Sequence, residues 1–326
     1  MRPLRFLLAL ALVIVALPTR ETTSAALPAP APESHLGLAA DVLGQAHEAL
    51  DLIFDAQSEK AIPIARSLQQ RLPDHPIGYL LEVEADWWAL YCQACSIRYN
   101  LIDAWSHEKE KRDDAYFALA NRAIQIAEGK LAQQETAPMH VFAGMGYGLK
   151  ARLHGLRGDH LAVARTGVRG REHFLRALAL DPQVGDALTG IGLYNYLADA
   201  LSGFAKMLRW FMGIPGGSKK EGIRQLEAAI NSAELTSAEA RFYLARNLRN
   251  FDEQYERGAQ LMEPLVAEYP DNPVFQLLLG DVYAKLNRRE PAALHFRAAQ
   301  QLHVSDAACA AQVQKLAADS LAVIGR

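Results

Sequence analysis

Two short motifs in this 326-residue chain contain residue types that could support chemistry. Cys92 and Cys95 form a CxxC pair, and Ser106 with Lys109 forms an SxxK motif. The CxxC lies inside a helical pattern and no histidine follows it, which excludes haem attachment and argues against redox catalysis. The SxxK lacks the companion motifs of the penicillin-binding enzymes. We therefore expect neither motif to be catalytic.

The chain has one further cysteine, Cys309, so a four-cysteine zinc site cannot form within it. We expect a buried or disulfide-bonded structural role for the cysteines. The sequence leaves open whether Cys92 and Cys95 are bonded to each other.

Other motifs of catalysis are missing as well. HExxH, GxSxG and the dinucleotide fingerprint are absent, and segment 213–220 lacks the GxxxxGK[ST] spacing of a phosphate-binding loop. His154 and His160 flank one turn, where solvated or capping roles are expected rather than a metal site. The net charge of -3, with basic residues interleaved among acidic ones, argues against nucleic acid as a partner. We predict no catalytic site, no metal and no cofactor.

The sequence pattern is mainly helical, so helices must position the side chains of any site. Apolar residues recur at i, i+3 and i+4, short polar breaks separate these segments, and no segment is a convincing strand. A Pro-containing corner recurs at 72–76, 181–184 and 269–273. Proline cannot extend the helix behind it and suits the first turn of the next one, so each corner predicts a helix-to-helix turn.

The corners fit a repeat of about 34 residues in which the proline closes the second helix. With Pro270 as that residue, the last unit has Gly280, Tyr283, Ala292, Phe296 and Ala299 at the packing positions of the tetratricopeptide repeat (TPR). This pattern resembles the TPR family. The resemblance predicts an all-α fold, a right-handed superhelix of antiparallel helix pairs, or α-solenoid.

The repeat is irregular in its middle. Segments 77–106 and 113–134 are interpreted as two elongated helices, and 202–218 as an insertion. The predicted organisation is a signal peptide (1–26), a flexible segment (27–40), about six helix pairs (41–304) and a capping helix (305–326).

The N-terminus has the features of an export signal. Arg2 and Arg5 precede an apolar run at 7–17, and small residues follow at 24–26. The run is short for a membrane span, and no lipid-anchor cysteine follows it. We expect a periplasmic or secreted protein. Segments 151–158, 190–196 and 213–217 are similar to segments of exported bacterial TPR proteins of uncertain function, a resemblance that implies no catalytic residues.

In TPR units, defined positions of the first helix face an inner, concave groove. These positions and their neighbours supply the predicted binding residues, a set rich in aromatic and amide side chains that suits peptide contacts. They are Glu84, Trp87, Trp88, Tyr194, Asn195, Tyr196, Tyr243, Asn247, Asn250 and Asp281. The alternative is that the tryptophans pack in the core, and because they are adjacent, at least one of the two should do so.

The insertion carries an amphipathic stripe. Its apolar members are Phe204, Met207, Leu208, Phe211 and Met212. The stripe predicts either a short helix packed on the repeats or a contact with a partner or a membrane surface through 203–214.

Two functions fit these features. The first is a non-catalytic, extracytoplasmic scaffold that binds a protein or peptide in its groove. The second is a periplasmic protein of a solute-uptake system that binds a lipid or an organic acid, with a pocket around Trp87, Tyr194 and Tyr196.

Overall fold

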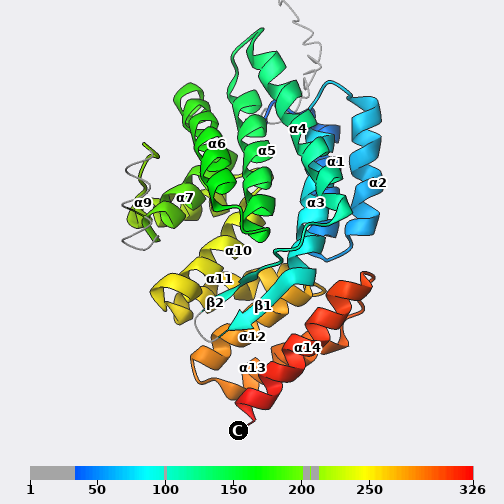
Figure 1. Ribbon diagram of the computed structural model, residues 1–326, viewed down its shortest axis with the longest axis vertical. Coiled ribbons are helices and arrows are strands. Elements are labelled where there is room, and N and C mark those ends of the chain that lie inside the picture. Colours follow the sequence, from blue (N-terminus) through cyan, green and yellow to red (C-terminus); the bar gives the residue numbers. More distant parts are fainter. Residues whose placement is uncertain (1–33, 99–100, 201–205, 207–212, 326) are drawn as a thin grey trace, which may run out of the picture. The chain divides into compact units, whose positions relative to one another are not determined.

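The computed structural model describes residues 34–98, 101–200, 206 and 213–325. Within these residues the fold is an all-α stack of antiparallel helix pairs of the TPR kind, as predicted (Figure 1). The pairs are α1 (Ala40–Phe54) with α2 (Ser58–Arg71), α3 (Ile77–Ala94) with α4 (Lys111–Leu131), α5 (Ala137–Leu156) with α6 (His160–Leu180), α7 (Gly185–Ala200) with α9 (Lys219–Ser232), α10 (Ser237–Asn247) with α11 (Tyr255–Glu268), and α12 (Pro273–Lys285) with α13 (Arg289–Gln301). A single helix, α14 (Ala307–Ile324), follows the last pair and packs on α13.

The predicted Pro-containing corner at 269–273 starts its second helix with a side-chain cap. Asn272 accepts hydrogen bonds from the backbone N–H groups of Val274 and Phe275, and Pro273 occupies the first helical position of α12. Asp306 caps α14 in the same way through Cys309 N. These caps satisfy N–H groups that have no partner within the helix.

Paired helices approach closely where the repeat pattern places glycine. A Cβ atom added at Gly280 of α12 would lie 2.9 Å from the ring of Phe296 in α13. One added at Gly192 of α7 would lie 2.9 Å from Cγ of Leu226 in α9. The small residue at one position and the large residue at the other therefore interlock, as the sequence frame requires.

A π-helical turn, η1 (Leu248–Asp252), extends α10. It ends at Glu253, which has a left-handed backbone with φ of 53°. A π-helical turn is wider than an α-helical turn, so it changes the direction of the side chains that follow α10. Such turns are frequent at functional sites.

The expected absence of strands is wrong. A two-stranded antiparallel sheet, β1 (Cys95–Arg98) and β2 (Leu101–Ala104), follows α3, with Ile97 opposite Ile102. The elongated helix expected over 77–106 therefore ends at Ala94. The edge of β2 that does not face β1 is hydrogen-bonded to the side chain of Asn250 in η1. The spacing of apolar residues within one segment does not reveal such a contact with a distant segment.

The cysteines have the structural roles expected of them. Cys92 of α3 is bonded to Cys309 of α14, a sequence separation of 217 residues, and Cys95 is a buried free thiol. Burial raises the pKa of the Cys95 thiol to about 12, which keeps it protonated and unreactive at neutral pH.

The first helices of distant pairs meet in one aromatic cluster. The Trp88 ring of α3 packs edge-on against Phe54, Phe242 and Phe275, which belong to α1, α10 and α12. Phe54 also contacts Tyr269, with ring centroids 5.5 Å apart. The early pairs therefore lie against the late ones rather than leaving a channel between them.

The apolar stripe of the insertion lies outside the described residues. Lys206, which is not part of the stripe, pairs with Asp199 at 3.0 Å. No helix in the described ranges is long and apolar enough to cross a membrane.

Candidate functional site

The predicted groove residues face inward, but the groove is filled. Seven are buried, namely Glu84, Trp87, Trp88, Tyr196, Tyr243, Asn247 and Asp281. Tyr194, Asn195 and Asn250 are partly buried. The expectation of an open concave surface is therefore wrong, because α3 and the β1–β2 hairpin occupy the space that an isolated TPR stack would leave to solvent.

Both tryptophans belong to the core. Trp87 Nε1 donates to the hydroxyl of Tyr243 at 3.1 Å, and Trp88 Nε1 donates to Glu84 at 2.8 Å. Arg152 of α5 pairs with Glu84 at 3.2 Å and lies over the Tyr243 ring. A buried charge needs such partners, so these polar groups support one another within the core.

The other aromatic and amide candidates form hydrogen bonds with neighbouring segments of the fold. Tyr194 donates to the carbonyl of Pro215 at 2.7 Å, and Asn195 donates to Gln225 at 2.8 Å. Tyr196 donates to the backbone carbonyl of Asn247 at 3.0 Å, next to the π-helical turn. The pocket expected around Trp87, Tyr194 and Tyr196 is therefore not formed by these residues.

The inner face, defined here by Arg246, Asn247, Arg249, Asn250 and Asp281 on α10, η1 and α12, holds the hairpin. The Asn250 side chain pairs with both backbone groups of Ile102: Nδ2 donates to the carbonyl at 2.9 Å, and Oδ1 accepts from the N–H at 2.9 Å. This contact recognises extended backbone independently of its side chains.

Two arginines of the inner face complete the contact. Arg246 Nη1 donates to the Asp103 carboxylate of β2 at 2.8 Å. Arg249 Nη2 donates to the backbone carbonyl of Arg98 in β1 at 3.0 Å. Sequence reasoning missed both arginines and Asp103. Arg246 and Arg249 are three residues apart beside the predicted Asn247 and Asn250, and this spacing was the signal available.

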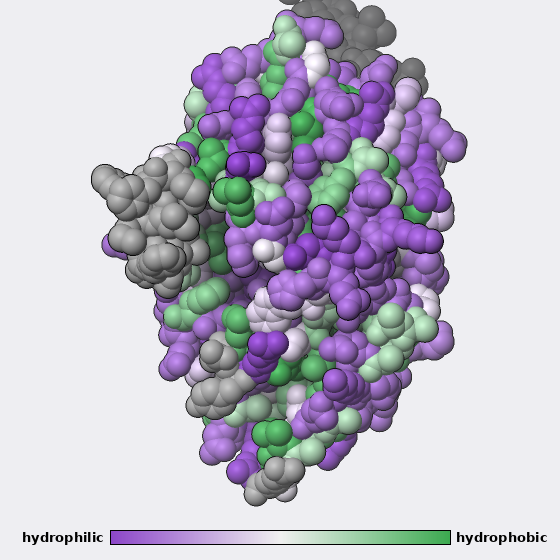
Figure 2. Space-filling model, viewed as in Figure 1, coloured by the Kyte–Doolittle hydropathy of each residue, from purple (hydrophilic) through white to green (hydrophobic). Residues whose placement is uncertain are grey.

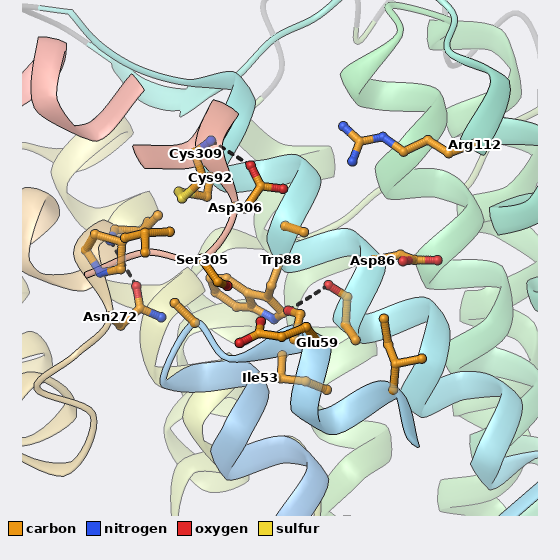
Figure 3. Close-up of a pocket in the computed structure, with 18 residues that line it drawn as sticks. Ile53, Glu59, Asp86, Trp88, Cys92, Arg112, Asn272, Ser305, Asp306 and Cys309 are labelled. Carbon is orange, nitrogen blue, oxygen red and sulfur yellow. Dashed lines mark hydrogen bonds between the residues drawn. A yellow bond between two sulfur atoms is a disulfide. The ribbon is translucent and has the colours of Figure 1, made fainter. Parts of the chain in front are cut away.

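A separate cavity of about 460 Å³ lies between α2, α3, α12 and the start of α14 (Figure 3). The Trp88 ring and the Cys92–Cys309 disulfide form part of its wall. Its ionisable lining groups are Glu59, Asp86, Arg112 and Asp306. The carboxylates outnumber the single guanidinium, so the cavity favours a cationic ligand over an organic acid.

Asp86 of α3 is partly buried in the cavity wall. Burial, followed by the nearby charge of Glu82, raises its pKa to about 6. A cation bound beside Asp86 would offset the cost of burying its ionised form.

The described residues contain no cluster of three or more histidine, cysteine, aspartate or glutamate side chains able to hold a metal. The outer surface in the view of Figure 2 is mostly hydrophilic, with apolar residues scattered in small groups. A broad apolar docking patch is not seen among the described residues on this face.

Comparisons with known proteins add little to this geometry. No known family matches the chain, and no curated protein matches it. Among solved structures, the chain is similar to one in the crystal structure of the APC/C hetero-tetramer Cut9–Hcn1, with 14% identity over 81% of this chain and a TM-score of 0.35. The chain covers 47% of that protein, about half its length.

Proposed function

We propose that this protein is a non-catalytic scaffold outside the cytoplasm that binds an extended segment of a partner protein on its inner face. The observation that carries the proposal is the pairing of Asn250 with both backbone groups of Ile102. Helix faces that recognise backbone in this way suit peptide partners, since the contact does not depend on one side chain.

The location outside the cytoplasm has two supports. The N-terminal 26 residues have the composition of an export signal. The Cys92–Cys309 disulfide joins segments distant in the sequence, and such bonds persist mainly in oxidising compartments.

In-cell photo-crosslinking tests the scaffold. A photoreactive residue replaces Phe251, which is exposed in η1 next to Asn250, and in a matched variant it replaces Leu294, exposed on α13. We expect a specific partner to crosslink from position 251 and not from 294, and the substitution Arg246→Ala to reduce the yield severalfold. Equal yields from both positions, or none from either, would contradict the proposal.

The cavity supports a second candidate, the binding of a small cationic ligand. Its volume of about 460 Å³ falls within the range of small-molecule sites, and its excess of carboxylates suits an amine or a quaternary ammonium group. This candidate ligand class differs from the lipid or organic acid expected from sequence.

Calorimetric titration with choline and putrescine, with glutarate as the anionic control, tests this candidate. We expect at least one cation to bind the wild type and to bind Asp86→Asn at least tenfold more weakly. Glutarate binding as tight as that of the cations would reject the cavity as a cation site.

A further inference from the structure

We infer that the inner face is a preformed site for an extended peptide strand carrying a carboxylate, and that β2 is its internal occupant. The inference rests on the proposed function for the choice of surface, and it adds the chemistry of the partner and the means by which the site is kept closed.

The side chains that hold the hairpin are oriented without it. Arg249 is fixed by two hydrogen bonds to Asp281, at 2.6 and 3.1 Å. Arg246 donates to Asn247 at 3.1 Å and lies over the Tyr243 ring, 4.8 Å from its centroid. Because these partners belong to α10 and α12, the receiving groups keep their positions when the strand leaves.

The inner face also has donor capacity that the hairpin does not use. Asn247 is fully buried, and its Nδ2 has no hydrogen-bond partner among the described residues. A buried donor without an acceptor is costly, so an acceptor of a bound ligand would relieve that cost.

The contacts that β2 makes with the inner face define the chemistry of the ligand. Asn250 pairs with the backbone of one residue, whose side chain, that of Ile102, is buried. Arg246 pairs with the carboxylate of the next residue, Asp103. The matching partner is therefore an extended segment with an apolar residue followed by aspartate or glutamate.

Tethering explains how β2 keeps other strands out. A strand joined to the same chain by a short connection acts at an effective concentration on the order of millimolar. A free strand of equal intrinsic affinity therefore binds weakly until the contact of β2 is loosened.

A fluorescein-labelled peptide of residues 101–106 (Leu-Ile-Asp-Ala-Trp-Ser), followed by anisotropy, tests the site directly. The substitution Asp103→Asn removes the charge of the internal strand and leaves the inner face intact. We expect this variant to bind the peptide at least fivefold tighter than the wild type, and Asp103→Asn/Asn250→Ala to lose that gain. Asp74→Asn, the same change at an exposed loop residue, should behave as the wild type.

A peptide with lysine in place of its aspartate should not bind. A folded Asp103→Asn variant that binds no tighter than the wild type would overturn the inference, as would a gain that survives Asn250→Ala. Folding is checked by circular dichroism.

A second measurement needs no variant. In the wild type, millimolar peptide should speed hydrogen exchange at the amide of Ile102, which now donates to Asn250, and leave the amides of α5 unchanged. If Asp103→Asn does not fold, unchanged exchange at Ile102 overturns the inference. Peptide binding involves no cellular partner, so its failure is distinct from failure of the crosslinking experiment.

Discussion

At the residue scale, buried polar side chains form hydrogen bonds and ion pairs that join different segments of the chain. Asn250 holds the backbone of β2, Arg249 pairs with Asp281, and Arg152 joins Glu84 to the aromatic core. Each group would be costly to bury alone, because it would lose its hydration without compensation. The same side chains that are expected to bind a partner therefore also stabilise the folded protein.

Asp86 provides a test of this cost. Its pKa of about 6 in the folded protein lies above the usual 3.8, so the folded state holds the proton more tightly than the unfolded state. The contribution of Asp86 to stability should therefore fall as pH rises from about 4 to 6. We expect Asp86→Asn to raise the free energy of unfolding at pH 7 by about 1–2 kcal/mol and to have a smaller effect at pH 4.5, where the carboxyl of the wild type is mostly protonated.

Urea unfolding at pH 4.5 and 7 measures both effects, with Asp74→Asn as the control for the loss of one exposed charge. An Asp86→Asn variant that kept the pH dependence of the wild type would show that this carboxyl is not its source.

At the scale of helices and strands, close packing within pairs and one covalent link between distant helices determine the arrangement. Gly280 admits the ring of Phe296, whereas Gly44 on the exposed side of α1 has no atom within 4 Å of an added Cβ. The Cys92–Cys309 bond ties α3, with the hairpin that follows it, to the last helix.

Substitution of these two glycines by alanine should have opposite effects. Gly280→Ala pushes a methyl group into the Phe296 ring and should lower the free energy of unfolding by about 1–3 kcal/mol. Gly44→Ala removes only the conformational entropy of glycine in a helix and should raise it by about 0.5–1 kcal/mol. Thermal melting of both variants measures the difference, and equal effects would argue against the pairing of α12 with α13 described here.

The disulfide should contribute about 2–5 kcal/mol, because it closes a long loop in the unfolded chain. Cys309→Ala should lose this amount in urea unfolding. A reductant should lower the wild type to the same value and leave the variant unchanged. A variant as stable as the oxidised wild type would mean that the bond adds nothing.

At the scale of the whole described molecule, the early helix pairs contact the late ones. In an open solenoid each repeat contacts only its neighbours, and unfolding can proceed repeat by repeat. Here α1 and α3 contact α12 and α14 through the aromatic cluster and the disulfide. Distant pairs should therefore unfold together.

Urea unfolding followed by tryptophan fluorescence and by circular dichroism should give coincident transitions. Trp88→Ala, which removes the centre of the cluster, should destabilise the protein by about 3–5 kcal/mol and separate the two transitions. A wild type with two resolved transitions would indicate that the early and late pairs are independent.

The sequence by itself determined the helix pairs, because their signals are local. Pro273 starts α12 at its first position, Asn272 caps the same helix through residues two and three positions away, and Gly280 lies opposite Phe296 within one unit. The sequence also placed Asn250 among the residues predicted to bind a partner, and in the structure its side chain pairs with the backbone of Ile102 of the same chain.

Only the tertiary structure decided what fills the inner face. Ile102 and Asn250 are 148 residues apart, and Cys92 and Cys309 are 217 apart. Burial of Trp88 depends on rings from three other helices. Such contacts arise when distant segments exclude water together, and the pattern of one segment holds no information about which partner it meets.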